Sequence, residues 1–215
     1  MGADTNGRAT MLTLYSMQDS GNSYKVRLLF AHLGLPFRIV DVDTTTGETH
    51  KGDFLAINPI GKAPVVVLDD GRALAESGAI LLHFAEGSRF LPIDAYERAK
   101  CYEWMFFEQY SHEPAIAVRR ALHVYETRRA QATPERLREL LEKGNEALGV
   151  MEQRLVAHDW LAGPAFSIAD IALYAYTHDA EDKGGFDLKL FPGIRGWLAR
   201  VAGEAGHVTI DWRPA

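Results

Sequence analysis

The chain has 215 residues, 23 of them basic and 29 acidic, which gives a formal net charge of −6. This mildly acidic balance, without a basic block, argues against nucleic acid as a partner. A hydrophobic content of 47% excludes a largely disordered chain. The one cysteine, Cys101, excludes an intrachain disulfide, so a reducing, cytoplasmic location is expected. No apolar run reaches the ~18 residues of a membrane span, so no membrane partner is expected.

The first ten residues are polar and are expected to form a flexible tail. The apolar stretch 11–15 predicts a strand, and turn-forming residues follow at 16–23. Apolar residues then recur at the spacing of one helical face up to Leu33, and the alternating stretch 37–42 predicts a second strand. A strand–helix–strand unit of this length implies parallel pairing with a right-handed crossover.

The next stretch completes a compact α/β domain. A short helical piece is expected near 54–57, and the continuous apolar run 64–68 predicts a buried strand. After a tight turn, residues 72–74 are expected to pair antiparallel with that strand, and a helix begins at Glu76-Ser77. Residues 11–87 therefore read as one domain of order β-α-β-(α)-β-β-α.

Signs of strands end after this domain. Residues 88–94 are expected to form a linker, and residues 95–215 an all-helical domain. Pro114 is expected to kink or end a long helix. Ser167 and Asp170 have the spacing of a capping box, with Asp in place of Glu, at the start of a core helix.

Four segments, taken together and in order, resemble the cytosolic glutathione transferase superfamily. They are Ser-Gly-Asn-Ser-Tyr-Lys-Val-Arg at 20–27, Asn-Pro-Ile-Gly-Lys-Ala-Pro at 58–64, Glu-Ser at 76–77, and Phe-Ser-Ile-Ala-Asp-Ile at 166–171. The resemblance implies a thioredoxin-like N-terminal domain followed by an all-helical domain. It also implies glutathione as co-substrate and a homodimer.

The resemblance implies a glutathione site in the first domain. A cis peptide is expected between Ala63 and Pro64, where the family's backbone pairs with the cysteinyl part of glutathione. Ser77, at a helix N-terminus, would bind the γ-glutamyl carboxylate, and Glu76 would face the ammonium group. The alternatives are a trans Pro64 that begins an edge strand, and a Ser77 N-cap beside a solvated Glu76. The candidates for the glycyl carboxylate are His50 and Lys62, with Lys51.

The glutathione thiol must be held as a thiolate, because a free thiol has a pKa of ~8.5. Ser20, Asn22 and Ser23 lie near the start of the first helix and are the candidate donors, with Ser20 first and Asn22 second. The resemblance therefore implies a serine/asparagine-type site rather than a tyrosine-type site. The alternative for Ser20 or Asn22 is capping of the helix. The loop has no cysteine, which argues against glutaredoxin-like mixed-disulfide chemistry.

In proteins of this family the electrophile binds between the domains. The residues expected to line that pocket are Tyr15, Trp104, Phe107, Glu108 and His112, with Tyr110, Tyr174 and His178 as further candidates. Their alternative is ordinary core packing. The histidines lack metal-ligand spacing, so no metal is expected.

We therefore predict a glutathione transferase that joins the glutathione thiolate to a small, largely apolar electrophile. The alternatives are a glutathione-dependent isomerase or peroxidase, and a non-catalytic glutathione-binding module, because one fold can host all of these functions.

Overall fold

The structure is a computed structural model that describes residues 11–214, so the expected flexible tail at 1–10 lies outside the described residues. The chain divides into two compact units. The first contains the described residues up to Phe84 together with those from Val208 onward, and the second spans Ala85–His207. Among residues 11–214, no helix has the length and hydropathy needed to cross a bilayer.

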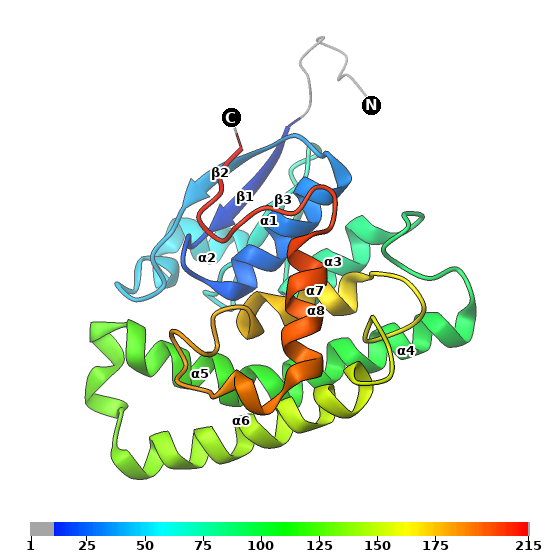
Figure 1. Ribbon diagram of the computed structural model, residues 1–215. Coiled ribbons are helices and arrows are strands. Elements are labelled where there is room, and N and C mark those ends of the chain that lie inside the picture. Colours follow the sequence, from blue (N-terminus) through cyan, green and yellow to red (C-terminus); the bar gives the residue numbers. More distant parts are fainter. Residues whose placement is uncertain (1–10, 215) are drawn as a thin grey trace. The chain divides into compact units, whose positions relative to one another are not determined.

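The first unit is built on a sheet whose described strands have the order β2-β1-β3-β4 (Figure 1). Strand β1 (Leu12–Ser16) pairs parallel with β2 (Phe37–Asp41) and antiparallel with β3 (Val65–Val67), which in turn pairs antiparallel with β4 (Ala73–Ala75). The two parallel strands are consecutive strands of the chain with a helix between them in sequence, so the predicted parallel pairing of a strand–helix–strand unit is confirmed. The predicted thioredoxin-like order of elements is confirmed.

Three helices complete this unit: α1 (Gly21–Leu33), α2 (Gly52–Ile57) and α3 (Ser77–Ala85). Helix α1 ends at Gly34, whose φ of 63° places it in the left-handed region that glycine adopts without a steric cost. The apolar faces of α1 and α3 meet the sheet in one buried cluster. Its members are Leu14, Val26, Phe30, Phe37, Val66 and Ile80.

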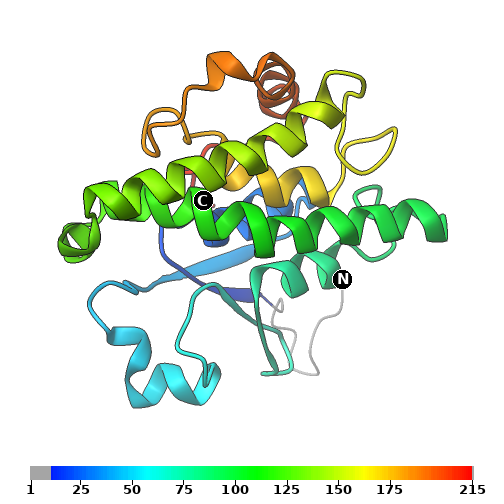
Figure 2. The same cartoon turned by 90° about the horizontal axis from the view of Figure 1, so that it is seen from below.

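The described part of the second unit is helical, as predicted, and Figure 2 shows α6 running beside α5. Its α-helices are α4 (Ala95–Phe107), α5 (Glu113–Val124), α6 (Pro134–Leu155), α7 (Ile168–Thr177) and α8 (Pro192–Ala202). Short 3₁₀ turns occur at Glu126–Gln131 and Leu188–Leu190, and in the first unit at Glu48–His50.

The long helix is interrupted close to Pro114, as predicted. A π-helical turn at Glu108–His112 joins α4 to α5, and Pro114 is the second residue of α5, just beyond that turn. The turn directs His112 into the interior, where its Nε2 lies 2.9 Å from Oγ1 of Thr177.

The capping box at the start of α7 is also confirmed. The Ser167 hydroxyl accepts from the Ala169 N–H, and Asp170 accepts from the Ser167 N–H at 3.0 Å. Asp170 is fully buried and also accepts from Leu161 N and Trp197 Nε1. Burial raises the pKa of Asp170 to about 6, because desolvation outweighs these hydrogen bonds. Both residues are structural, as expected.

The domain boundaries differ from the expected ones in two places. The expected linker 88–94 is part of the second unit: Phe90 and Leu91 are buried, and the Phe90 carbonyl accepts from Ile168 N at 2.9 Å. The expected helical domain 95–215 loses its end, since residues from 208 onward belong to the first unit. The cause is apolar packing, because Trp212 lies against the core of the first unit with its ring centre 6.1 Å from that of Phe37.

Candidate functional site

The loop between β1 and α1 carries the three candidate thiolate donors. Ser20 is the N-cap of α1, and its Oγ accepts from Ser23 N at 3.4 Å. Ser23 is fully buried, and its own Oγ accepts from Met17 N at 3.2 Å. The capping role left open for Ser20 and Asn22 therefore falls to Ser20, whose hydroxyl proton can still be donated while its oxygen caps.

Asn22 lies one residue into α1, and its side-chain oxygen accepts two hydrogen bonds. Lys25 Nζ donates to it at 2.7 Å, and the Ser77 hydroxyl at 3.3 Å. Lys25 is only 1% exposed. Its burial had no signal in the sequence beyond its place in a helix whose neighbouring residues are apolar. Together the two donors orient the Asn22 amide and connect the start of α1 with the start of α3.

The loop from Asn58 to Pro64 is organised by one buried side chain. Asn58 donates from Nδ2 to the Lys62 carbonyl at 2.8 Å and accepts at Oδ1 from Ile60 N at 3.1 Å. The peptide between Ala63 and Pro64 is cis, as the resemblance implied. Pro64 is buried and Lys62 is exposed.

Gly61 lets this loop approach His50. Its φ is 69°, and a Cβ at this position would lie 2.5 Å from His50 Nδ1. A larger residue here would be strained at this φ and would displace the His50 ring. The predicted residue His50 is exposed and lies against the loop that carries Lys62 and Ala63.

Glu76 and Ser77 form the junction between β4 and α3. Glu76 has a φ of 66°, which makes it the one described non-glycine residue in the left-handed region, and such strained residues cluster at functional sites. The Glu76 carbonyl accepts the Ile80 N–H at 3.0 Å, so Glu76 stands immediately before the helix and Ser77 is its first residue. Ser77 is buried, and Glu76 is exposed.

Strand register brings these segments to one end of the sheet. Tyr15 pairs with Val65, and Val65 pairs with Ala75. One residue further toward the same end of the sheet lie Ser16 after Tyr15, Pro64 before Val65 and Glu76 after Ala75. The β1–α1 loop, the cis-proline loop and the start of α3 therefore meet at the same end of the sheet, although they are far apart in sequence.

The residues predicted to hold an electrophile lie in different units. Tyr15 is in the first unit, half-buried and edge-on to Phe54. The others are in the second unit; Trp104, Glu108 and His112 are buried, and Phe107 lines a surface groove with Leu140 and Ala147 of α6. Contact of any of them with an electrophile stays a prediction.

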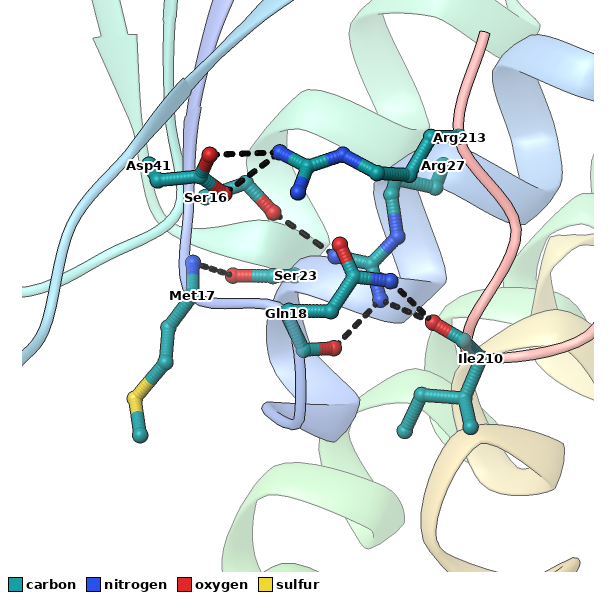
Figure 3. A network of polar contacts seen from close by, with 8 residues as sticks. All are labelled: Ser16, Met17, Gln18, Ser23, Arg27, Asp41, Ile210 and Arg213. Atoms are coloured by element: carbon teal, nitrogen blue, oxygen red, sulfur yellow. Dashed lines mark hydrogen bonds and ion pairs between the residues drawn. The ribbon is translucent and has the colours of Figure 1, made fainter.

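Behind the β1–α1 loop lies a buried guanidinium that the sequence interpretation missed (Figure 3). Arg27 is fully buried and donates from Nη1 to Ser16 Oγ at 2.7 Å, and from Nη2 to the carbonyls of Gln18 at 2.7 Å and Ile210 at 2.9 Å. Burial lowers the pKa of Arg27 to about 10, so the group keeps its charge at neutral pH.

The C-terminal segment, residues 208–214, is attached to this guanidinium and to the elements around it. The Tyr24 hydroxyl donates to the Val208 carbonyl at 2.7 Å, and Gln18 Nε2 donates to the Ile210 carbonyl at 2.7 Å. Arg213 forms an ion pair with both Asp41 oxygens at 2.6 Å (Figure 3). The apolar residues Val208, Ile210 and Trp212, alternating with polar ones, were the available sequence signal for this attachment.

Two other kinds of group that could carry chemistry are a metal-binding cluster and a reactive protein thiol. Within the part of the chain that the structure describes, no cluster of three or more His, Cys, Asp or Glu side chains could hold a metal ion. Cys101 is buried, and burial raises the pKa of its thiol to about 11, so it is not a thiolate source at neutral pH.

Comparison with known proteins gives consistent matches over most of the chain. The profile for the glutathione S-transferase N-terminal domain matches residues 10–86, and the one for the C-terminal domain matches residues 105–205. The Escherichia coli K12 protein "Disulfide-bond oxidoreductase YfcG" is 30% identical over 198 residues, which cover 89% of this chain and 90% of that protein.

Solved structures agree with these matches. A glutathione S-transferase from Pseudomonas fluorescens Pf-5 is 47% identical with a TM-score of 0.89, covering 93% of this chain and 98% of that one. A glutathione transferase from Burkholderia graminis, solved with two glutathione molecules bound per subunit, is 27% identical with a TM-score of 0.80, covering 92% and 85%.

Proposed function

The chain belongs to the glutathione S-transferase family, and from this premise we propose that it binds glutathione at the end of the sheet marked by Ser16, Pro64 and Glu76. The observation that carries the proposal is the convergence of three separate segments at that end of the sheet. Two of them, the starts of α1 and α3, are joined by the 3.3 Å hydrogen bond between Ser77 and Asn22. The glutathione bound to the Burkholderia graminis relative supports it.

The γ-glutamyl end of glutathione fits the start of α3. The N-terminus of a helix offers unpaired N–H groups and a positive dipole end, which favour a carboxylate. The exposed Glu76 carboxylate, next to these groups, suits an ammonium group. His50 and Lys62 are our candidates for the glycyl carboxylate, and the Ala63–Pro64 backbone for the cysteinyl amide.

The proposed reaction is attack of the glutathione thiolate on an electrophilic carbon. The thiol loses its proton, the sulfur forms a new bond to carbon, and the leaving group departs with the bonding pair. We propose Ser20 as the donor that stabilises the sulfur anion, with Asn22 as the alternative. Ser23 is disfavoured because its side chain is fully buried.

Thermal unfolding with glutathione and with cysteinylglycine tests this proposal. Ligand at 100 Kd adds ~2.7 kcal/mol to the free energy of unfolding, so millimolar glutathione should raise the Tm by several degrees. Cysteinylglycine lacks the γ-glutamyl group and should raise it far less. An unchanged Tm with saturating glutathione would refute binding. If glutathione binds, an assay of turnover with an aryl chloride distinguishes an enzyme from a binding module.

A second candidate activity is reduction of small disulfides, favoured by the name of the Escherichia coli relative. One glutathione thiolate would attack the disulfide and release a thiolate, which takes up a proton. A second glutathione would then attack the mixed disulfide, giving oxidised glutathione and the second thiol. This route needs no protein cysteine. Assaying an aryl chloride and a small disulfide side by side distinguishes the two activities.

We also propose that the protein is a homodimer, as the family resemblance implies. Two-fold dimers are the commonest soluble oligomers. Light scattering at micromolar concentration should give twice the chain mass of 23.9 kDa, and the mass of one chain would contradict the proposal.

A further inference from the structure

The β1–α1 loop is held from behind by groups that belong to α1 and to the chain's last residues. Arg27 reaches the loop at two points, the Ser16 hydroxyl and the Gln18 carbonyl. Ser20, the first candidate thiolate donor, lies two residues beyond Gln18 and donates its own N–H to the Met17 carbonyl at 3.1 Å. Ser20 therefore lies between a short loop that Arg27 binds at Ser16 and Gln18 and the first turn of α1, which it caps.

The Ile210 carbonyl is the point where the C-terminal segment meets this loop. It accepts from Arg27 Nη2 at 2.9 Å and from Gln18 Nε2 at 2.7 Å (Figure 3). Arg27 therefore lies between the loop and the segment, with one donor nitrogen shared by the two carbonyls. A bond from a charged donor to a buried acceptor is among the stronger hydrogen bonds in proteins.

Apolar packing anchors the end of the segment. Trp212 packs on the core beside Phe37. The Arg213–Asp41 pair is well exposed, with side chains 47% and 61% accessible, so it contributes little. Loosening Trp212 should release the Ile210 carbonyl without altering any atom of the loop.

We propose that Arg27 and the C-terminal segment 208–214 form a brace that positions the Ser20 side chain against the glutathione sulfur. This inference rests on the proposed function. Arg27 is then a positioning residue that acts through the loop. The γ-glutamyl end of glutathione is bound at Glu76 and Ser77, outside the brace, so the brace sets the rate of the chemical step and leaves affinity nearly unchanged.

Two full-length variants test the brace, Trp212→Leu in the segment and Arg27→Lys in α1. Arg72→Ala is the surface control in the same unit, because it removes the exposed Arg72–Asp70 pair, which has no contact with the brace. Hydrogen exchange of the ligand-free proteins is followed by mass spectrometry, and kcat and KM for glutathione are measured with an aryl chloride.

We expect faster exchange confined to residues 16–23 and 208–214 in both variants. We also expect kcat to fall about tenfold while KM for glutathione changes by less than about twofold, because only the transition-state contact is disturbed. Arg72→Ala should match the wild type in each measurement.

Unchanged exchange at 16–23 in Trp212→Leu would overturn the brace, as would exchange that rises throughout the first unit. A rise in KM with unchanged kcat would overturn its positioning role. If Arg27→Lys does not fold, Trp212→Leu alone decides. If the wild type neither binds nor turns over glutathione, the proposed function fails, and the exchange data still decide whether the brace exists.

Discussion

The hydroxyl of Ser77 lies 3.3 Å from the side-chain oxygen of Asn22, a residue 55 positions earlier in the chain. This bond joins the first turn of α3 to the first turn of α1, and the buried amine of Lys25 shares the same oxygen at 2.7 Å. The two helix starts that we propose for the sulfur and for the γ-glutamyl group of glutathione are therefore connected, and each can be tested separately.

Ser20→Ala should raise the pKa of the bound thiol and lower kcat by roughly ten- to a hundredfold, because a hydrogen bond to a charged group is worth ~1.5–3 kcal/mol. Glutathione affinity should change little. Thiolate absorbance against pH and steady-state rates measure both effects. If Asn22→Ala moves these quantities and Ser20→Ala does not, the donor is Asn22.

The control for Ser20→Ala is Thr133→Ala. Thr133 is the N-cap of α6 and accepts from Arg136 N at 3.2 Å, so this variant loses a comparable cap, worth ~1 kcal/mol, in the other unit. It should lower the Tm without changing the thiol pKa. An equal loss of turnover in both variants would show that general stability, not a donor, explains the Ser20 result.

Glu76→Gln should weaken glutathione binding about tenfold or more, because it removes the charge that we propose to face the ammonium group. The side chain keeps nearly the same shape, so the left-handed backbone at this residue is not further disfavoured. Calorimetric titration with glutathione measures the effect. Glu142→Gln, an exposed change of the same kind in α6, should leave Kd unchanged. Equal affinities for all three proteins would contradict the role of Glu76.

Two glycines of α6 should respond to alanine in opposite directions. At Gly144 a Cβ would lie 2.5 Å from Cζ of the buried Phe186 ring, so Gly144→Ala should destabilise by about 1–3 kcal/mol. At Gly149 nothing lies within 4 Å, so Gly149→Ala should stabilise by about 0.5–1 kcal/mol through helix propensity. Urea denaturation measures both, and the same sign for the two variants would contradict this packing.

Asp170 should make stability depend on pH in the direction opposite to an ordinary ion-paired carboxylate. Its folded pKa is about 6 and its unfolded pKa ~4, so between these values the folded state binds the extra proton. This contribution to the free energy of unfolding is fully present below pH ~4 and is lost as pH rises through about 6, a change of roughly 3 kcal/mol.

Comparison with Asp170→Asn isolates this effect, because the variant lacks the titrating group and other carboxyl groups contribute equally to both proteins. The stability difference between wild type and Asp170→Asn should be larger at pH 4.5 than at pH 7 by urea denaturation. A difference that is the same at both pH values would show that the Asp170 pKa is not raised on folding.

Local features of the chain were predictable from sequence because they depend on neighbours a few residues apart. The alternation in 37–42, the capping box of Ser167 and Asp170, and the helix break near Pro114 all follow from spacing and backbone chemistry. The cis peptide at Ala63–Pro64 followed from the family resemblance rather than from these rules.

Features made by distant residues were not predictable in this way. Arg27 and Ile210 are 183 positions apart, and no periodicity relates them. Periodicity predicted the apolar face of α1, yet it did not predict that Lys25 and Arg27 are buried too. A buried charge needs partners to offset the loss of water. Lys25 donates to Asn22 of its own helix, whereas the partners of Arg27 come from other segments: Ser16, Gln18 and Ile210. The sequence by itself determined the order of elements and the candidate motifs, whereas only the tertiary structure decided which polar groups hold those motifs in place.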